Sequence, residues 1–390
     1  MQRWLLALWL AAAGPAFAQA PAIVVGAVLP ASGQLADLGE EMRKALVLWQ
    51  ERCSAEGGLL GRAITLRLLD DGSEASASLR LYEQLIQSEQ ADLLLGPLGS
   101  AATMAAAATV ERAGQLLLNV TGVTESVQRE GRRQVFHVPA PLSAYGAGPL
   151  AIVESAGHGK LQVLARNDPR SREAAERLAE AAGRRGLQVA VQFTAPGATE
   201  YAAQIAAARA RNAEAWIAFG IAEDAAEMVK TFKRIGYAPW LFLAQGAAEP
   251  EFIRRVGQDA EHALGLTAYE PNANWPANRA FLAAWRERWQ GEPGVLAAHA
   301  YAAGLVLQAA VQAAGALETE RLRVALRRLE VDTPLGRHRV DADGVQVGVK
   351  PAVVQIQRGR REVVWPPELA TAQWQLPYPR WDERQVHAPQ

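Results

Sequence analysis

The sequence contains a single cysteine, Cys53, and has no net excess of either charge sign. One thiol cannot form an internal disulfide, so no disulfide framework holds this chain together. Its 40 lysines and arginines are balanced by 41 acidic residues, for a formal net charge of −1. Nucleic acids and anionic membranes attract proteins through clustered positive charge. The composition therefore gives no reason to expect a nucleic-acid partner.

Several motifs of catalysis and cofactor binding are also missing. The sequence has no H-E-x-x-H or C-x-x-C spacing, no G-x-S-x-G and no G-x-G-x-x-G after a strand. Gly159-Lys160 lacks the upstream glycine of a P-loop, because Glu154 occupies that position. Asp341-Ala342-Asp343-Gly344 has no closing glutamate, so it predicts a turn and not a calcium loop. We therefore expect no metal, no cofactor and no catalytic activity.

Long apolar runs are absent except near the N-terminus. Arg3 precedes the apolar run 4–13, and Ala16-Phe17-Ala18 follows a helix-breaking Gly14-Pro15. This is the order of a secretory signal peptide, and the run is too short to cross a bilayer. We expect residues 1–18 to be a signal peptide. No later segment looks long and apolar enough to span a membrane, so the mature chain should be soluble in the periplasm.

Half of the 390 residues are hydrophobic, enough for two ordinary globular domains. Short β-rich runs alternate with helix-length segments, first at 23–29, 64–70, 92–96 and 115–119. A second series follows at 161–165, 187–193, 215–220 and 240–245. Such alternation predicts parallel sheets covered by helices. The fold class is therefore α/β, with two Rossmann-like lobes.

Between the two series, the proline-containing segment 135–141 predicts a crossing from one lobe to the other. A second crossing is expected at 266–272, and three helices should follow it. Asp343-Gly344 lies between alternating residues, which indicates a hairpin. In open α/β sheets ligands bind at the carboxyl ends of strands, so the functional residues should come directly after strands.

The order of these segments resembles the leucine/isoleucine/valine-binding protein family, the type I periplasmic binding proteins of ABC transporters. The resemblance begins with IVVGAVLPASGQLADLGEEMRKALVL at 23–48 and continues with LLLGPLGSAAT at 93–103. It extends through KTFKRIGYAPWLFLAQG and DADGVQVGVKPAVVQIQRG, and covers about 23–365. It implies two lobes joined by three hinge crossings around a cleft that closes on the ligand.

The expected organisation assigns residues 22–138 with 271–340 to lobe 1, and 139–270 with 345–365 to lobe 2. A proline- and tryptophan-rich tail, 366–390, should lie on the surface of one lobe.

The resemblance places a ligand-binding serine at Ser100, next to Gly99. Ser100 follows a strand and should cap a helix, where free amides and the helix dipole favour a carboxylate. The family's second carboxylate-binding loop corresponds to Thr121, Gly122, Val123 and Thr124. Val123 stands where the family usually has a threonine, so Thr121 or Thr124 would have to supply the hydroxyl. The first cleft loop contains Ser32.

Three residues of lobe 2 depart from the family pattern. Gln245 occupies the position of the carboxylate that holds the ammonium of an amino acid. Arg170 and Ile221 stand where aromatic residues are common. A buried ammonium without a carboxylate is costly, which disfavours a branched-chain amino acid. Arg170 either meets a second polar oxygen of the ligand or points to solvent from the start of a helix.

These observations favour a monomeric solute-binding protein that delivers a small carboxylate-bearing solute to a membrane permease. The solute could be an amino acid, an amide, or an aliphatic or aromatic acid. A ligand-sensing domain of a receptor would have the same lobes but would need a signalling segment. A transcriptional regulator would need a DNA-binding head in place of the signal. An exported α/β hydrolase would need a strand-end nucleophile with a histidine and an acid, which the spacing does not offer.

The order of charged, apolar and small residues at the N-terminus predicts cleavage after Ala18. Intact-mass analysis of protein released from the periplasm should therefore find a chain that begins at Gln19. A mass that includes Met1 would contradict this prediction.

Overall fold

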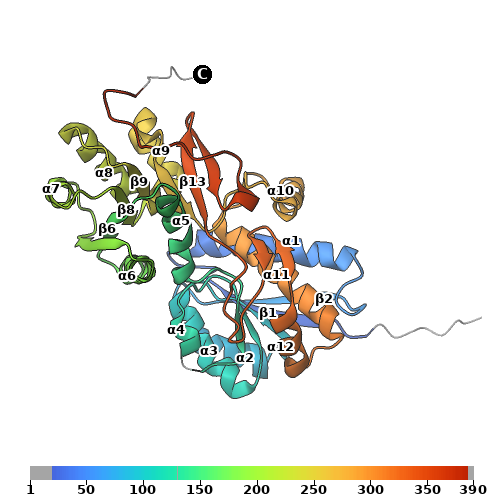
Figure 1. Ribbon diagram of the computed structural model, residues 1–390. Coiled ribbons are helices and arrows are strands. Elements are labelled where there is room, and N and C mark those ends of the chain that lie inside the picture. Colours follow the sequence, from blue (N-terminus) through green and yellow to red (C-terminus); the bar gives the residue numbers. More distant parts are fainter. Residues whose placement is uncertain (1–19, 130, 385–390) are drawn as a thin grey trace, which may run out of the picture.

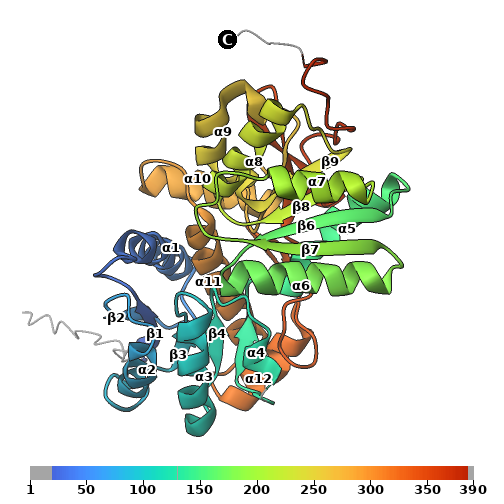
Figure 2. The same ribbon diagram turned by 90° about the vertical axis from the view of Figure 1, so that its left-hand side faces the viewer.

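Two separate β-sheets organise the chain into two lobes (Figure 1). The computed structural model describes residues 20–129 and 131–384, so the predicted signal peptide lies outside the described residues. In Figure 1 the blue and cyan N-terminal part lies beside the orange helices α11 and α12, and together they form lobe 1. The green and yellow middle part and the red strands form lobe 2 (Figure 2).

Lobe 1 is built on a five-stranded parallel sheet in the order β2-β1-β3-β4-β5. Its strands are β1 (Ile23–Leu29), β2 (Ile64–Asp70), β3 (Leu93–Leu95), β4 (Leu117–Asn119) and β5 (Val135–His137). Successive side chains of a strand point to opposite faces. Continuous apolar runs such as LLL in β3 therefore bury both faces of the sheet, which is typical of a doubly wound fold.

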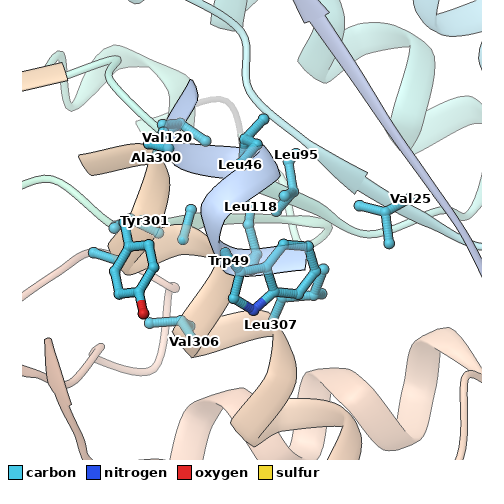
Figure 3. Packing of buried hydrophobic residues seen from close by; sticks show 14 of the residues in the cluster. Val25, Leu46, Trp49, Leu95, Leu118, Val120, Ala300, Tyr301, Val306 and Leu307 are labelled. Carbon is cyan, nitrogen blue, oxygen red and sulfur yellow. The ribbon is translucent and has the colours of Figure 1, made fainter. Parts of the chain in front are cut away.

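Helices cover both faces of this sheet. Helices α2 (Ala77–Gln87) and α3 (Ser100–Ala113) pack on one face, against residues such as Leu94. Helices α1 (Ala36–Ala55) and α11 (Val295–Ala314) pack on the other, where Trp49, Leu95 and Leu118 meet Val306 and Leu307 (Figure 3). The later helices α10 (Pro276–Arg288) and α12 (Thr319–Arg328) extend the same core. A short helix, α4 (Ser126–Arg129), follows β4.

Lobe 2 contains a seven-stranded sheet in the order β14-β13-β10-β9-β8-β6-β7. Its parallel strands are β6 (Lys160–Arg166), β7 (Gln188–Thr194), β8 (Ala215–Phe219), β9 (Leu241–Ala244) and β10 (Leu264–Thr267). An antiparallel hairpin of β13 (Ala352–Gln357) and β14 (Arg360–Trp365) completes it. Helices α5 (Ala147–Ser155) and α6 (Pro169–Arg184) cover one face. The other face is covered by α7 (Ala202–Ala210), α8 (Ala222–Ile235) and α9 (Pro250–Val256).

Three connections join the lobes, at 138–141, 268–275 and 339–351. The first and third lie side by side, because the amide of His137 donates to the carbonyl of Gly344 over 2.9 Å. A two-stranded ribbon of β11 (Val331–Thr333) and β12 (Gly336–His338) precedes the third connection. The predicted turn closes there, since Val340 pairs with Gln346 across it.

The expected crossings were placed slightly too early in the chain. Residues 135–137 of the first are the edge strand β5, and residues 266–267 of the second complete β10. Both segments are short and end near a proline, so the sequence pattern did not separate strand from connection. The pairing of β5 with β4, and of β10 with β9 and β13, decides the difference.

The C-terminal tail packs on lobe 2. The amide of Tyr378 donates to the carbonyl of Trp240, and the side chain of Tyr378 is buried against Phe242. The indole of Trp381 donates to the carbonyl of Tyr237 over 2.7 Å. The guanidinium of Arg384 lies over the Trp381 ring at 3.7 Å. These aromatic contacts attach the tail to the lobe.

Helix α11 is the one helix among the described residues whose length and mean hydropathy of 1.4 would suffice to cross a membrane. The expectation that no later segment reaches this threshold was therefore wrong. In the structure 67% of its apolar window is buried, in the core of lobe 1. The apolar character of α11 is thus that of a helix surrounded by protein on most sides.

Helix α11 packs closely against α1 at Gly304, so replacing this glycine with alanine should destabilise the protein although alanine favours helices. A Cβ atom at Gly304 would lie 2.3 Å from the Trp49 ring, whereas one at Gly183 in α6 would meet open space. Gly304→Ala should lower the midpoint of thermal unfolding, because overpacking costs about 1–3 kcal/mol and exceeds the gain in helix propensity. The control Gly183→Ala should leave the midpoint unchanged or raise it. Equal midpoints for both variants would contradict this packing.

Candidate functional site

A cavity of about 560 Å³ opens at the carboxyl ends of β6, β8, β9 and β10. Residues 292–295, which lead into α11 of lobe 1, also line it, so the cavity lies between the two lobes. This is the end of a parallel sheet at which ligands of α/β proteins bind. The cavity is therefore the candidate site.

The three predicted residues of lobe 2 all line this cavity. Arg170 lies in the first turn of α6, which begins where Asp168 accepts a hydrogen bond from the amide of Ser171. Ile221 precedes α8 in an extended conformation and remains 43% exposed, which is unusual for a large apolar side chain. Gln245 directly follows β9. All three thus come just after strands, as the fold requires.

Arg170 is the central charge of the cavity. Burial raises the pKa of Tyr145, and the nearby charge of Arg170 partly offsets this rise. Its charge also acts on His299 of α11 and on Glu249 of lobe 2. Arg170 is an exposed residue in the first turn of α6 that lines the cavity, and its charge reaches groups of both lobes.

Glu249 is a carboxylate of the cavity that the sequence analysis missed. It lies four residues after Gln245, at the N-cap of α9, but its side chain does not cap that helix. Its carboxylate lies near the amide of Ala222 at the start of α8, which acts to lower the pKa of Glu249. Burial raises the pKa of Glu249, and Arg170 acts against this rise. The signal was only its position after a strand, since a glutamate before a proline also fits an ordinary helix start.

The other charged groups of the cavity are compensated within the protein. Asp168 accepts from the amide and the hydroxyl of Ser171 at 2.9 Å each. Arg361 pairs with Glu270 at 3.2 Å. On the lobe 1 side of the cavity, Glu292 forms an ion pair with Arg286 at 2.8 Å.

Ser100 is the first residue of α3, and the expectation that it caps this helix was wrong. Gly99 is the N-cap residue, and no side chain caps the helix. The Ser100 hydroxyl instead accepts hydrogen bonds from the amides of Val123 (3.2 Å) and Thr124 (3.3 Å). Its own hydrogen remains available as a donor, next to amides of the first helical turn that have no intrahelical acceptor.

The threonines of the second loop have partners within lobe 1. The Thr121 hydroxyl donates to the carbonyl of Pro97 and accepts from the amide of Gly99 over 2.6 Å. The Thr124 hydroxyl is hydrogen-bonded to Ser126. Gly122 lies so close to α3 that a Cβ there would be 2.6 Å from the Thr103 hydroxyl oxygen. These contacts hold the loops after β3 and β4 together.

Val123 carries the contact between this loop and lobe 2. Its side chain packs against the hydrophobic cluster that contains Leu142 and Tyr145, and its carbonyl accepts from the amide of Leu142. A threonine would place a hydroxyl in this apolar contact. The departure from the family pattern therefore has a packing role in this chain.

Ser32 belongs to an exposed turn that is held by Asp70 at the end of β2. The Ser32 hydroxyl donates to Asp70 over 2.7 Å, and the amide of Ala31 donates to the same carboxylate. These hydrogen bonds, the one from Ser32 first, lower the pKa of Asp70. Ser32 is thus engaged in local turn structure.

The structure brings the predicted residues together in two groups. Arg170, Ile221 and Gln245 share the cavity, while Ser100 and residues 121–124 form a hydrogen-bonded cluster in lobe 1 that does not line it. In the described part of the chain, no group of three or more histidine, cysteine, aspartate or glutamate side chains could hold a metal ion.

The comparison of the chain with known proteins decides its family. Residues 22–361 match the family model described as periplasmic binding protein. The chain belongs to this family. Its members are extracytoplasmic binding proteins of ABC transporters, which confirms the resemblance seen in the sequence and the two-lobed type I fold.

Curated periplasmic binding proteins align with most of the chain. The leucine-, isoleucine-, valine-, threonine- and alanine-binding protein of Pseudomonas aeruginosa is 21% identical over 321 residues, which cover 81% of this chain and 84% of that protein. A Leu/Ile/Val-binding protein homolog of Brucella abortus is 31% identical over 138 residues, which cover 35% of this chain and 34% of that protein.

Solved structures share the fold. A putative branched-chain amino acid ABC transporter protein from Silicibacter pomeroyi is 20% identical, with a TM-score of 0.81 over 91% of this chain and 99% of that one. The substrate-binding protein from Streptococcus pneumoniae in complex with isoleucine is 22% identical, with a TM-score of 0.69 over 88% of this chain and 100% of that one. A solute-binding protein from R. palustris in complex with benzoate is 21% identical, with a TM-score of 0.69 over 92% of this chain and 97% of that one.

Buried histidines predict how the stability of this binding protein depends on pH. Burial lowers the pKa of His137, His299 and His338 to about 4, against about 6.5 in an unfolded chain. Between pH 6.5 and pH 4 these histidines are neutral in the folded chain and charged in the unfolded chain, so unfolding takes up protons. The histidines therefore cost no stability above pH 6.5, and they lower the free energy of unfolding as the pH falls towards 4. Glu270, whose pKa burial raises to about 7, acts in the opposite direction, but it is one group against three.

The free energy of unfolding should therefore fall between pH 7 and pH 5, as measured by urea denaturation. His299→Gln removes one group that takes up a proton on unfolding. The slope of the unfolding free energy against pH should therefore decrease by about 1.4 kcal/mol per pH unit. His158, which is only partly buried and pairs with Glu214, provides the control variant His158→Gln. Stability that is constant or rises towards pH 5 would contradict the prediction.

Proposed function

We propose that this protein is the periplasmic solute-binding component of an ABC importer and catalyses no reaction. Exported through residues 1–18, it would capture a small carboxylate-bearing solute between its lobes and deliver it, as a monomer, to a membrane permease. Residues 22–138 with 271–340 would move as lobe 1, and 139–270 with 345–365 as lobe 2. Hinge closure around a ligand is an established switching mode of such two-lobed proteins.

The observation that carries this proposal is the interlobe cavity with Arg170 inside it. About 560 Å³ is a volume that suits a small solute. Arg170 forms no ion pair with a described residue, although its guanidinium suits an anionic or polar oxygen. Arg170 is exposed at the wall of the cavity, so its guanidinium is open to an anionic or polar group that enters the cleft.

Lobe 1 offers a second set of donors for the ligand carboxylate. The Ser100 hydroxyl hydrogen and the free amides of the first turn of α3 lie at the end of β3. A helix start stabilises negative charge through these amides and its dipole. In this proposal closure brings this helix start to the ligand, and the loop 121–124 supports Ser100.

The ligands of related proteins support a carboxylate. One relative is named for five aliphatic and hydroxyl amino acids, one solved structure holds isoleucine and another holds benzoate. The amino acids also share an α-ammonium, which benzoate lacks, so the carboxylate is the one group that all of these molecules have in common. The shared group is the one that we assign to this chain.

A thermal-shift screen of amino acids, amides, and aliphatic and aromatic acids should identify carboxylates that raise the unfolding midpoint. Ser100→Ala should then weaken binding of the best ligand by about 10- to 150-fold in calorimetry, because one donor to a charged group is worth about 1.5–3 kcal/mol. Binding should not vanish, because the amides of α3 remain.

The control variant is Ser88→Ala, which changes an exposed serine at the end of α2. Its affinity should equal that of the wild type. Melting of both ligand-free variants separates a loss of binding from a loss of folding. If no carboxylate binds, the proposed function is refuted. If a carboxylate binds tightly and Ser100→Ala does not weaken it, the proposed lobe 1 site is refuted.

A further inference from the structure

Three polar side chains of lobe 2 line the cavity without a full set of partners. Arg170 and Glu249 form no ion pair with each other or with any other residue in the described part of the chain. The carboxamide of Gln245 makes no hydrogen bond to a described residue. The cavity therefore presents one cation, one anion and one neutral amide to whatever fills it.

The two charges cancel at this end of the cavity. The remaining charged residues of the lining have partners, namely Ser171 for Asp168, Glu270 for Arg361 and Arg286 for Glu292. Arg170 and Glu249 are close enough to influence each other, yet no direct contact joins them. A ligand group between them should therefore be neutral overall, with an oxygen for Arg170 and an N–H for Glu249.

We propose that Arg170, Gln245 and Glu249 select a carboxamide at the end of the ligand opposite its carboxylate. The ligand class is then a small acid with a terminal amide or urea group. Its oxygen accepts from Arg170, its N–H groups donate to Glu249, and Gln245 pairs with the same group through its own amide. This assignment rests on the proposed function, because it takes the carboxylate end to be held by lobe 1.

Alternative end groups fit this arrangement less well. A second carboxylate would meet Arg170 but would be repelled by Glu249 and would have no donor for it. A methyl end would leave both charges desolvated and unpaired when the cleft closes. An ammonium alone would satisfy Glu249 and be repelled by Arg170. A carboxamide, which is both acceptor and donor, satisfies the pair without adding charge.

A matched series of ligands tests the assignment. Succinamate, succinate and butyrate carry the same carboxylate and differ at the other end, as do glutaramate, glutarate and valerate with one more methylene. Calorimetry at pH 7 should show at least one of the two amide acids binding about 10-fold or more tightly than its diacid and its aliphatic acid.

Two variants identify the residues responsible. Glu249→Gln removes the repulsion, so the preference for the amide acid over the diacid should shrink by about 10-fold or more. Arg170→Gln should weaken the diacid and the amide acid alike. The controls change the same charges nearby: Glu251→Gln, which pairs with Arg254, and Arg172→Gln, which pairs with Glu176. Both controls should keep the wild-type preference.

The outcomes separate this inference from the function on which it rests. If a diacid, an aliphatic acid or leucine binds more tightly than both amide acids, or if Glu249→Gln keeps the preference, the carboxamide assignment is wrong while the solute-binding function stands. If no carboxylic acid of any kind binds, the proposed function itself fails.

Discussion

The buried carboxamide of Asn119, at the end of β4, joins the cleft loop of lobe 1 to the connections between the lobes. It is fully buried and accepts from the amide of Gly122 while donating to the carbonyl of the same residue. Its second N–H meets Nδ1 of His137 at 2.8 Å. The backbone of His137 in turn bonds Gly344 in the third connection. A continuous set of hydrogen bonds therefore connects the loop 121–124 with the first and third connections.

A second amide plays a similar part in the third connection. The side chain of Gln346 donates to the carbonyl of Val138 and to Nδ1 of His338, and accepts from three backbone amides of the connection. Because both histidines accept through Nδ1, both are neutral with the proton on Nε2. Burial keeps them so, since it lowers the pKa of each to about 4. The side-chain hydrogen bonds of Asn119 and Gln346 to these two histidines are therefore neutral.

The start of α11 is the part of lobe 1 that reaches the cavity, and lobe 1 fixes its position from two sides. The Glu41 carboxylate of α1 accepts from the amide of Ala297 over 2.9 Å. Further along, the absence of a side chain at Gly304 lets α11 approach the Trp49 ring of α1. Residues 292–295 are thereby presented to lobe 2, where Arg170 supplies the opposite wall.

The sequence by itself determined the alternation of strands and helices, the division into two sheets and the family. The strands at 23–29 and 64–70 have the predicted bounds, and the first of them is an apolar run buried on both faces, which leaves a strong local signal. Arg170, Ile221 and Gln245 were found through the resemblance to the family, and they follow strands, where ligands of α/β proteins bind. Short edge strands such as β5 were missed, since only pairing with a neighbour makes them strands.

Only the tertiary structure decided which polar groups remain free. The Thr121 hydroxyl has both a donor and an acceptor within lobe 1, whereas the Ser100 hydroxyl accepts from two amides and keeps its hydrogen as a donor. Glu249 was not singled out in the sequence, yet the fold places it in the lining of the cavity with Arg170. The residue type sets which hydrogen-bond donors, acceptors and charges a side chain carries. Whether a group is satisfied depends on segments far away in the chain, and that is a property of the packed molecule.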